Sequence, residues 1–273
     1  MKKNNLPTLI AISALSWISV NIIHEFIGHA GFGMLSGLKL IAVNTTTAYL
    51  NINWDDYRSI RLLTLGGVSM NFITGLIALL ILKFRKPVNF QFGLFLWLFA
   101  SFSLIIIAMN LISVTLIGGG DLPGFIKTFN NQNTAKIIVL ITGLIIMITG
   151  YMIIQKSFIP ELKGHRSILI TITLIPVLTV IIVQTLSLLK SPFAWLPPSQ
   201  NHLLASVFAY LHFLLWVLVV NIIPFPGKTN SPENASAGKS ISWIITGIIM
   251  VFFYIFILGP GIGSFAGHPS FQG

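Results

Sequence analysis

Residues 8–35 read TLIAISALSWISVNIIHEFIGHAGFGML, a long apolar run that carries two histidines and a glutamate near its end. A helix that crosses a bilayer needs about 20 apolar residues, and ionisable groups inside such a helix are costly. The run begins after Lys2 and Lys3, as a secretory signal does. No small-residue cleavage site follows, however, and the apolar run continues past His29. It is therefore expected to be a retained membrane span.

The composition of the 273-residue chain is that of a membrane protein. Hydrophobic residues make up 55% of it and charged residues 8%, whereas soluble domains carry about 25% charged residues. The chain has no cysteine, which excludes disulfides, thiolate metal sites and cysteine nucleophiles. The net charge is +10, with basic residues at the ends of apolar runs. This placement indicates contact with anionic lipid headgroups rather than with nucleic acid.

The chain is predicted to form a single integral membrane domain over residues 1–273, all-α and polytopic. About seven apolar runs are long enough to cross the membrane as helices. They are Thr8–Leu35, Ile60–Phe84, Phe92–Ile117, Ala135–Ile154, Ser167–Leu189, Leu203–Ile223 and Ile241–Leu258. Lys and Arg residues number ten on the N-terminal side of these spans and six on the other. This bias favours a cytoplasmic N-terminus in a multi-pass protein of the cell membrane.

The connection after the first span differs from the others. Leu38–Trp54 reads LKLIAVNTTTAYLNINW, which is rich in β-branched residues and alternates in part. This pattern predicts a short hairpin or extended strand at the membrane surface, and an irregular interfacial loop is an equal alternative.

His24, Glu25 and His29 fall within six residues of the first apolar run. Imidazoles bind zinc, and a glutamate beside them acts as a base on metal-bound water. The alternative is a set of polar residues bonded to neighbouring helices. The usual zinc-protease helix has its histidines at i and i+4, whereas five residues on an ideal helix leave these rings about 140° apart. A one-residue π-bulge would bring both histidines to one metal, and Gly28 lowers its cost.

Two resemblances to known families follow from these residues. The hexapeptide His24–His29 resembles the H-E-x-x-x-H zinc motif of the soluble dipeptidyl peptidase III family, in which both histidines are ligands. Residues 8–125 resemble the site-2 protease family of intramembrane zinc metalloproteases. The resemblance implies a metalloprotease-like core over 8–125 and additional transmembrane helices over 135–258. It also implies a metal site nearer the cytoplasm, whereas the loop charges place that end outside, so sidedness stays open.

The site-2 protease pattern is matched in part. In that family a surface β element follows the H-E-x-x-H helix, and Leu38–Trp54 occupies that place. A glycine-led A-G-P-x-x-N motif comes next, which Gly66–Asn71 matches in its glycine and asparagine, with Val68 where proline is typical. The family's aspartate ligand ends a later span, as Asp121 does here after Gly118–Gly120. The chain departs from the pattern in the extra helix residue and in lacking N-x-x-P-x-P before the aspartate.

Asp121 is the favoured third metal ligand, with a loop-turn residue as the alternative. It follows a span that ends on the side of the membrane nearer the two histidines. The N-x-x-P-x-P pattern recurs at Asn221–Pro226, but on the far side. At the ligand position it offers Thr229, followed by Asn230, and neither is a strong zinc ligand. His202 and His212 are alternative third ligands if Asp121 is not one, although a structural hydrogen bond is the favoured role for each of them.

The resemblance implies an intramembrane zinc metallohydrolase, a peptidase that cleaves membrane-embedded polypeptides. Glu25 would be the catalytic base on the attacking water. Asn71 is a candidate for holding the substrate backbone or a developing oxyanion, or for joining helices. The segment Leu38–Trp54 would hold an unwound substrate by edge pairing. The alternatives are a zinc hydrolase acting on lipid, a metal transporter and a non-enzymatic degenerate scaffold. The expected partners are a membrane-bound polypeptide and the lipid bilayer, without nucleic acid, and the oligomeric state is open.

Overall fold

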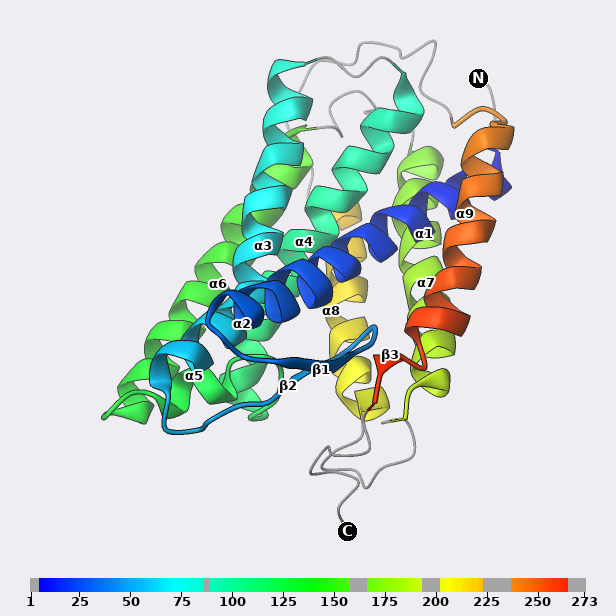
Figure 1. Cartoon of the computed structure of the whole chain (residues 1–273). Coiled ribbons are helices and arrows are strands. Elements are labelled where there is room, and N and C mark those ends of the chain that lie inside the picture. The colour runs from blue at the N-terminus through cyan, green and yellow to red at the C-terminus, as the bar shows by residue number, and fades with distance from the viewer. Residues whose placement is uncertain (1–4, 86–88, 158–165, 193–201, 223–236, 265–273) are drawn as a thin grey trace.

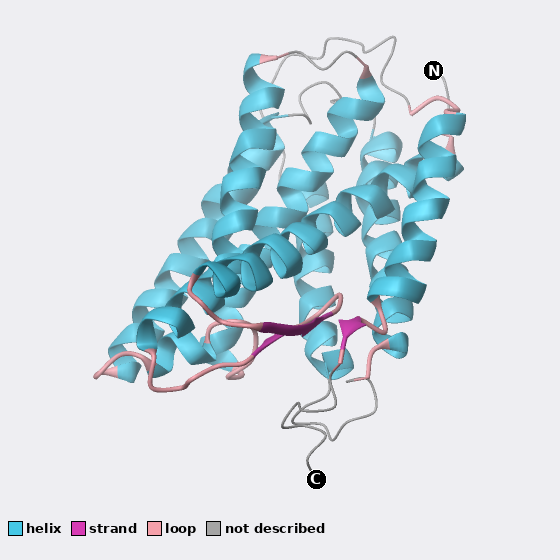
Figure 2. Cartoon of the chain, viewed as in Figure 1, coloured by secondary structure: helices cyan, strands magenta, loops and turns pink. Residues whose placement is uncertain are grey.

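The computed structural model describes residues 5–85, 89–157, 166–192, 202–222 and 237–264. It is a bundle of long helices with a small sheet at one end (Figures 1 and 2). The helices are α1 (Leu6–Ile22), η1 (Ile23–Gly31), α2 (Phe32–Leu35), α3 (Tyr57–Phe84), α4 (Phe90–Leu116), α5 (Pro123–Lys127), α6 (Gln132–Ser157), α7 (Arg166–Lys190), α8 (His202–Ile222), α9 (Ile241–Phe253) and η4 (Tyr254–Leu258). The strands are β1 (Leu40–Val43), β2 (Ala48–Leu50) and β3 (Ile262–Gly263).

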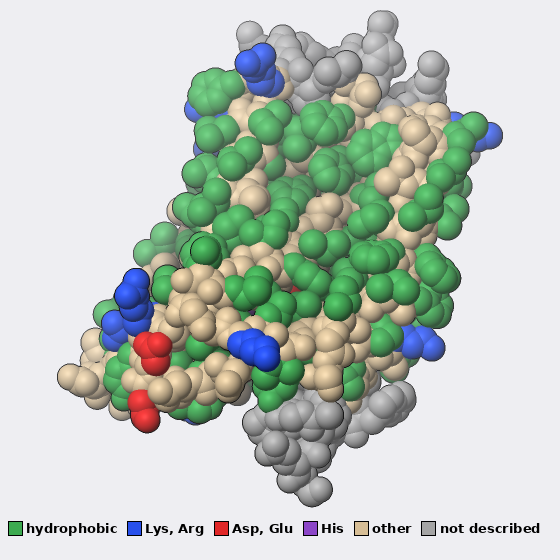
Figure 3. All heavy atoms as spheres, viewed as in Figure 1, with side chains coloured by type: hydrophobic (Ala, Val, Ile, Leu, Met, Phe, Trp, Pro, Cys, Tyr) green, Lys and Arg blue, Asp and Glu red, His purple; other side chains and the backbone are tan. Residues whose placement is uncertain are grey.

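Within the described residues, six helices are long and apolar enough to cross a membrane. They are Leu6–Leu35, Tyr57–Phe84, Phe90–Leu116, Gln132–Ile154, Ile168–Lys190 and Ile241–Leu258. The predicted mostly helical fold with long apolar helices is therefore confirmed, and it is compatible with a protein that spans a membrane. The seventh predicted span corresponds to α8, whose described side chains form a shorter apolar helix, Ala209–Ile222. On the face drawn in Figure 3, hydrophobic side chains cover the middle of the bundle and charged ones lie towards its ends, as a bilayer requires.

The first span begins with a capped turn and crosses the bundle obliquely (Figure 1). The side chain of Asn5 accepts a hydrogen bond from the Thr8 backbone N–H, and Pro7 stands in the first turn, where its missing N–H costs nothing. The chain then passes from α1 through η1 into α2 without a break. Helix α1 packs against α4, α7 and α9, whereas η1 packs against α3.

Aromatic rings fix α1 against its neighbours. Trp17 meets Phe102 of α4 and Phe213 of α8 edge-on, with ring centroids 6.1 and 5.5 Å apart. Trp216 lies 6.4 Å from Phe102 in the same cluster. Edge-to-face pairs of this kind add to the stabilisation from burial alone. These ring contacts hold α1 against α4 and α8.

The segment after the first span is a β-hairpin, which confirms the hairpin prediction over the irregular loop. Strand β1 pairs antiparallel with β2, with Val43 opposite Ala48 and Leu40 opposite Leu50. A third strand, β3, comes from the far end of the chain and pairs with the other edge of β1. The strand order is therefore β2-β1-β3. The sheet lies beside η1 and α2 (Figure 2).

Close backbone contact joins η1 to α3. Gly28 faces Gly66 and Gly67 so tightly that a Cβ on Gly28 would lie 2.5 Å from the Gly67 Cα and 2.7 Å from its N. Glycine at helix interfaces in membranes allows such an approach, which larger residues prevent. Backbone atoms cannot rotate away as a side chain can, so any larger residue at Gly28 must push the two helices apart.

We expect Gly28→Ala to lower the stability of the protein by about 1–3 kcal/mol, because overpacking of a tight contact costs that much. The measurement is the midpoint of thermal unfolding in detergent. Gly238→Ala is the matched control, since a Cβ there meets nothing within 4 Å. Equal shifts for the two variants would show that η1 and α3 are not held at this contact.

Candidate metal centre

The two histidines of the first span meet because the helix widens. Residues Ile23–Gly31 form a π-helix, in which hydrogen bonds run from i to i+5. Side chains five residues apart then point to one side. The Nε2 atoms of His24 and His29 are 3.2 Å apart, and both rings are buried. The predicted π-distortion is confirmed in kind, but it extends over nine residues rather than one.

Asp121 reaches the histidines from the connection between α4 and α5. Gly118 and Gly120 have φ values of +67° and +82°, a region open mainly to glycine. Asn110 of α4 holds the turn, because its Oδ1 accepts a hydrogen bond from the Asp121 N–H at 3.1 Å. Gly120 lies so close to Asn110 that a Cβ would come 2.6 Å from that oxygen. The glycines thus shape the turn that aims the carboxylate.

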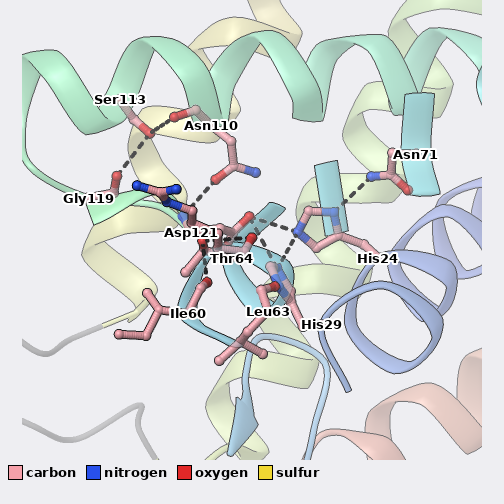
Figure 4. A network of polar contacts seen from close by, with 11 residues as sticks. His24, His29, Ile60, Leu63, Thr64, Asn71, Asn110, Ser113, Gly119 and Asp121 are labelled. Atoms are coloured by element: carbon pink, nitrogen blue, oxygen red, sulfur yellow. Dashed lines mark hydrogen bonds and ion pairs between the residues drawn. The ribbon is translucent and has the colours of Figure 1, made fainter. Parts of the chain in front are cut away.

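His24, His29 and Asp121 form a group that could hold a metal ion (Figure 4). Oδ2 of Asp121 lies 2.8 Å from His24 Nε2 and 3.5 Å from His29 Nε2. Ligand atoms around a tetrahedral ion with bonds of about 2.0–2.1 Å are about 3.3 Å apart. The three atoms here, separated by 2.8, 3.2 and 3.5 Å, match that spacing. The donor set of two imidazoles and one carboxylate therefore fits one metal ion.

The outer nitrogen of each imidazole is held by α3. The Leu63 carbonyl oxygen accepts a hydrogen bond from His29 Nδ1 at 2.7 Å, which leaves the Nε2 lone pair of the neutral ring facing the site. The Asn71 amide contacts His24 Nδ1 at 3.0 Å. Hydrogen bonds to the outer nitrogen of a metal-binding histidine orient its ring and fix its tautomer. Helix α3 therefore supplies the outer support of both rings.

Gly67 of α3 stands directly against both imidazoles. A Cβ at this position would lie 2.5 Å from His29 Nε2 and 2.7 Å from His24 Nε2. Any side chain here would occupy the space between the donors and α3. Gly66 and Gly67 are therefore explained by local packing. A larger residue at Gly66 would collide with the π-helix, and one at Gly67 would collide with the two rings.

Glu25 is buried beside the three donors without being one of them. Only 5% of the residue is exposed, and its carboxylate interacts electrostatically with His24, His29 and Asp121. It does not belong to the cluster of ligand atoms found among the described residues. A carboxylate in this place is suited to exchanging a proton with a molecule held by the three donors.

Asp121 is the negative partner of the two rings and the member nearest to solvent. Burial on its own raises the pKa of the Asp121 carboxyl, but the adjacent imidazoles of His29 and His24 outweigh this and hold the pKa well below its usual range. The carboxyl is therefore ionised and able to bind a cation. Its side chain is 22% exposed, against 5% for His24.

The other residues singled out in the sequence fall in different places. The Asn71 amide contacts the candidate ligand His24. A contact between Asn71 and substrate stays a prediction. His212 lies in α8 and does not belong to the cluster found among the described residues. The backbone of His202 starts α8, but its side chain lies outside the described residues, as do Thr229 and most of Asn221–Pro226.

Two supports of the site were not predicted from the sequence. Asn110 belongs to no motif in the sequence, yet a buried amide in an apolar span is itself a signal of a specific hydrogen bond. The Leu63 carbonyl leaves no side-chain signal, because any residue carries that oxygen. Its role follows only from the place where α3 passes His29.

We expect Gly67→Ala to weaken the binding of a divalent metal ion by about tenfold or more, because the new methyl displaces both rings. The measurement is a competition titration with a chromophoric chelator in detergent. Gly75→Ala is the matched control: it lies on the same helix, and its Cβ would meet Ser103 at 2.9 Å, away from the imidazoles. If both variants lose affinity equally, the effect comes from helix packing and not from the rings.

No protein-family model, curated protein or solved structure matches this chain. The function must therefore be inferred from the site itself.

Proposed function

We propose that this chain is an intramembrane zinc metallohydrolase that acts as a peptidase on membrane-embedded polypeptides. The observation that carries the proposal is the convergence of His24, His29 and Asp121, with their donor atoms 2.8–3.5 Å apart, next to the buried Glu25. Three protein ligands and a neighbouring carboxylate are the set that catalytic zinc sites use.

The donor set favours zinc over the hard cations. Magnesium and calcium prefer all-oxygen sites, whereas two imidazoles suit zinc and its neighbours in the first transition row. Three protein donors leave a fourth tetrahedral position for water or substrate, which distinguishes catalytic from structural zinc sites. Zinc in this place would polarise a substrate carbonyl and lower the pKa of bound water to about 7.

Glu25 is the proposed general base. Its carboxylate accepts a proton as water attacks the carbonyl carbon of a peptide bond, and it returns that proton to the leaving nitrogen when the C–N bond breaks. One water is consumed, and a carboxylic acid and an amine are formed. Asp121 keeps the two imidazoles paired with a negative charge while this proton moves. Burial of Glu25 strengthens these electrostatic interactions, since the surroundings screen them little.

The surroundings favour a polypeptide from the membrane as substrate. The histidines lie within a helix long and apolar enough to cross the bilayer, so a polypeptide that itself lies in the membrane is the substrate expected there. A transmembrane helix shields its own peptide bonds and must unwind before it can be cleaved. The hairpin of β1 and β2 lies beside η1 and offers backbone groups to an unwound segment. Ester bonds of lipids obey the same chemistry, so the assay must contain both substrates.

We expect the purified chain to bind about one zinc per molecule, with the zinc lost in the single variants His24→Ala, His29→Ala and Asp121→Ala. Truncation of any one donor leaves too few ligands for a tight site. The measurement is elemental analysis of detergent-purified protein. His212→Ala and His202→Ala are the controls, and both should keep the metal. Wild-type protein without zinc would contradict the hydrolase proposal. If Asp121→Ala retained zinc, the third ligand would instead be His202 or His212.

We expect Glu25→Gln to keep its zinc and to lose cleavage by about 100-fold or more, the contribution typical of a general base. The substrates are a tagged single-span polypeptide with a Gly-Pro pair in its apolar segment and, in parallel, a total lipid extract. Loss of polypeptide cleavage in Glu25→Gln supports the peptidase. Wild-type protein that holds zinc and releases only fatty acids would make the chain a lipid hydrolase. Equal cleavage by Glu25→Gln would contradict the role of this carboxylate.

Asn71 provides a finer test of the site. Its Nδ2 faces His24 Nδ1, and its Oδ1 has no hydrogen-bond partner within the described part of the chain. A histidine that binds a metal through Nε2 carries its proton on Nδ1, so a half-turn of the amide lets Oδ1 accept that proton. We expect Asn71→Leu to weaken zinc binding by about 10–100-fold and Asn71→Asp to retain it. The competition titration measures both, and equal losses would show that the contact with His24 is only packing.

A further inference from the structure

The middle strand of the sheet is paired on both edges, and one of its partners comes from the far end of the chain. Strand β3 follows η4, the last turn of the final apolar helix. It places Ile262 opposite Val43 and Gly263 opposite Ala42 in antiparallel register, and the Ser264 N–H donates to the Ile41 carbonyl at 3.4 Å. The chain thus fills an edge of its own hairpin.

That edge is of the kind that an extended polypeptide binds. Main-chain hydrogen bonds to an exposed strand supply affinity. They can form with any unwound segment, because every backbone carries the same donors and acceptors. Strand β1 follows α2 after a short turn, so it is joined closely to the helix that carries His24 and His29. A polypeptide laid along β1 would therefore be held by the same continuous segment that holds the metal donors.

The resident strand is held less firmly than the hairpin. It makes two register pairs, and Ile262 is 51% exposed, so little apolar area holds it down. Its backbone is also selective, because Gly263 has a φ of +99° and a Cβ there would lie 2.8 Å from the Ala42 Cα. Only glycine allows the chain to come this close to β1.

The hairpin, in contrast, is fixed at its tip. Asn44 donates from Nδ2 to the Ser191 hydroxyl at 3.1 Å, and the Thr45 hydroxyl bonds that of Ser187 at 2.8 Å. These four side chains are buried, with at most 2% of each residue exposed. Departure of β3 therefore leaves β1 in place, because α7 and not β3 holds the turn.

We propose that β3 is a built-in stand-in strand, which an extended polypeptide displaces when it binds the β1 edge. The inference rests on the proposed function for the identity of that polypeptide, an unwound segment of the membrane-bound substrate. The site has two states, closed by Ile262–Ser264 or open to the incoming strand. The closed state keeps the polar edge of β1 satisfied when no substrate is present, as unpaired strand edges invite unwanted pairing.

A disulfide lock tests the displacement. The chain has no cysteine, so Val43→Cys with Ile262→Cys provides one pair only. Directly opposed antiparallel residues have Cα atoms about 4.5–5.5 Å apart, which suits a disulfide. Both changes are made in the Glu25→Gln chain, so that bound polypeptide is not consumed. The tagged single-span polypeptide with the Gly-Pro pair is the probe, and its retention by the immobilised chain is measured.

The oxidised pair should lose retention of the probe, and reduction with dithiothreitol should restore it in the same sample. Ile262→Cys alone, oxidised in the same way, is the control for oxidation itself. Zinc content is measured for every sample, so that damage to the metal site is recognised. Equal retention by the oxidised and the reduced pair would overturn the proposal, as would a lack of retention in both.

An opposite variant opens the edge. Gly263→Val cannot take its place against Ala42, so β3 should leave and retention of the probe should rise. The expected gain approaches the inverse of the fraction of chains that are open before the change. Gly238→Val, with open space around its Cβ, is the matched control. Unchanged retention in Gly263→Val would overturn the proposal. Retention needs no catalysis, so a wild-type chain that binds zinc but cleaves nothing would overturn the proposed function and not the displacement.

Discussion

Five residues separate His24 from His29, and a helix of ordinary pitch would turn them to different sides. The structure resolves this with a π-helix from Ile23 to Gly31, and much of the neighbourhood follows from that choice. The wide turn needs a partner that lies close, which α3 provides through Gly66 and Gly67. The same partner supplies the Leu63 carbonyl and the Asn71 amide that hold the two rings. The five-residue spacing of the histidines thus goes together with the π-helix and with the contacts from α3 that hold both rings.

The sequence predicted the parts of this arrangement that depend on local pattern. The spacing of the histidines required a π-distortion, and the β-branched run at Leu38–Trp54 indicated a hairpin. Both are present. The aspartate was reached by asking on which side of the membrane each span ends, and Asp121 does lie with the histidines. These predictions succeeded because each rests on periodicity or on span direction, which short stretches of sequence contain.

The remaining features depend on contacts between distant segments. Two residues of β3 pair with a strand more than two hundred positions earlier, and nothing in Gly-Ile-Gly predicts that partner. The length of the π-helix could not be predicted either, because the spacing of the two histidines requires a distortion but does not set how far it extends. The hydrogen bond to the Leu63 carbonyl could not be predicted from side chains, because every residue carries a backbone carbonyl. Where the sequence is compatible with several arrangements, packing between distant segments therefore determines which one forms.

The partial exposure of Asp121 bears on the direction in which water and products would move. The most accessible donor lies on the connection after α4, at the end of the bundle that carries the hairpin (Figure 1). In the proposed hydrolase, water from that end would meet Asp121 first, because its side chain is 22% exposed. A newly formed carboxylate or ammonium group is costly to keep in hydrocarbon, so the charged product ends would leave by that end too. One compartment would then both supply the reactant and receive the product.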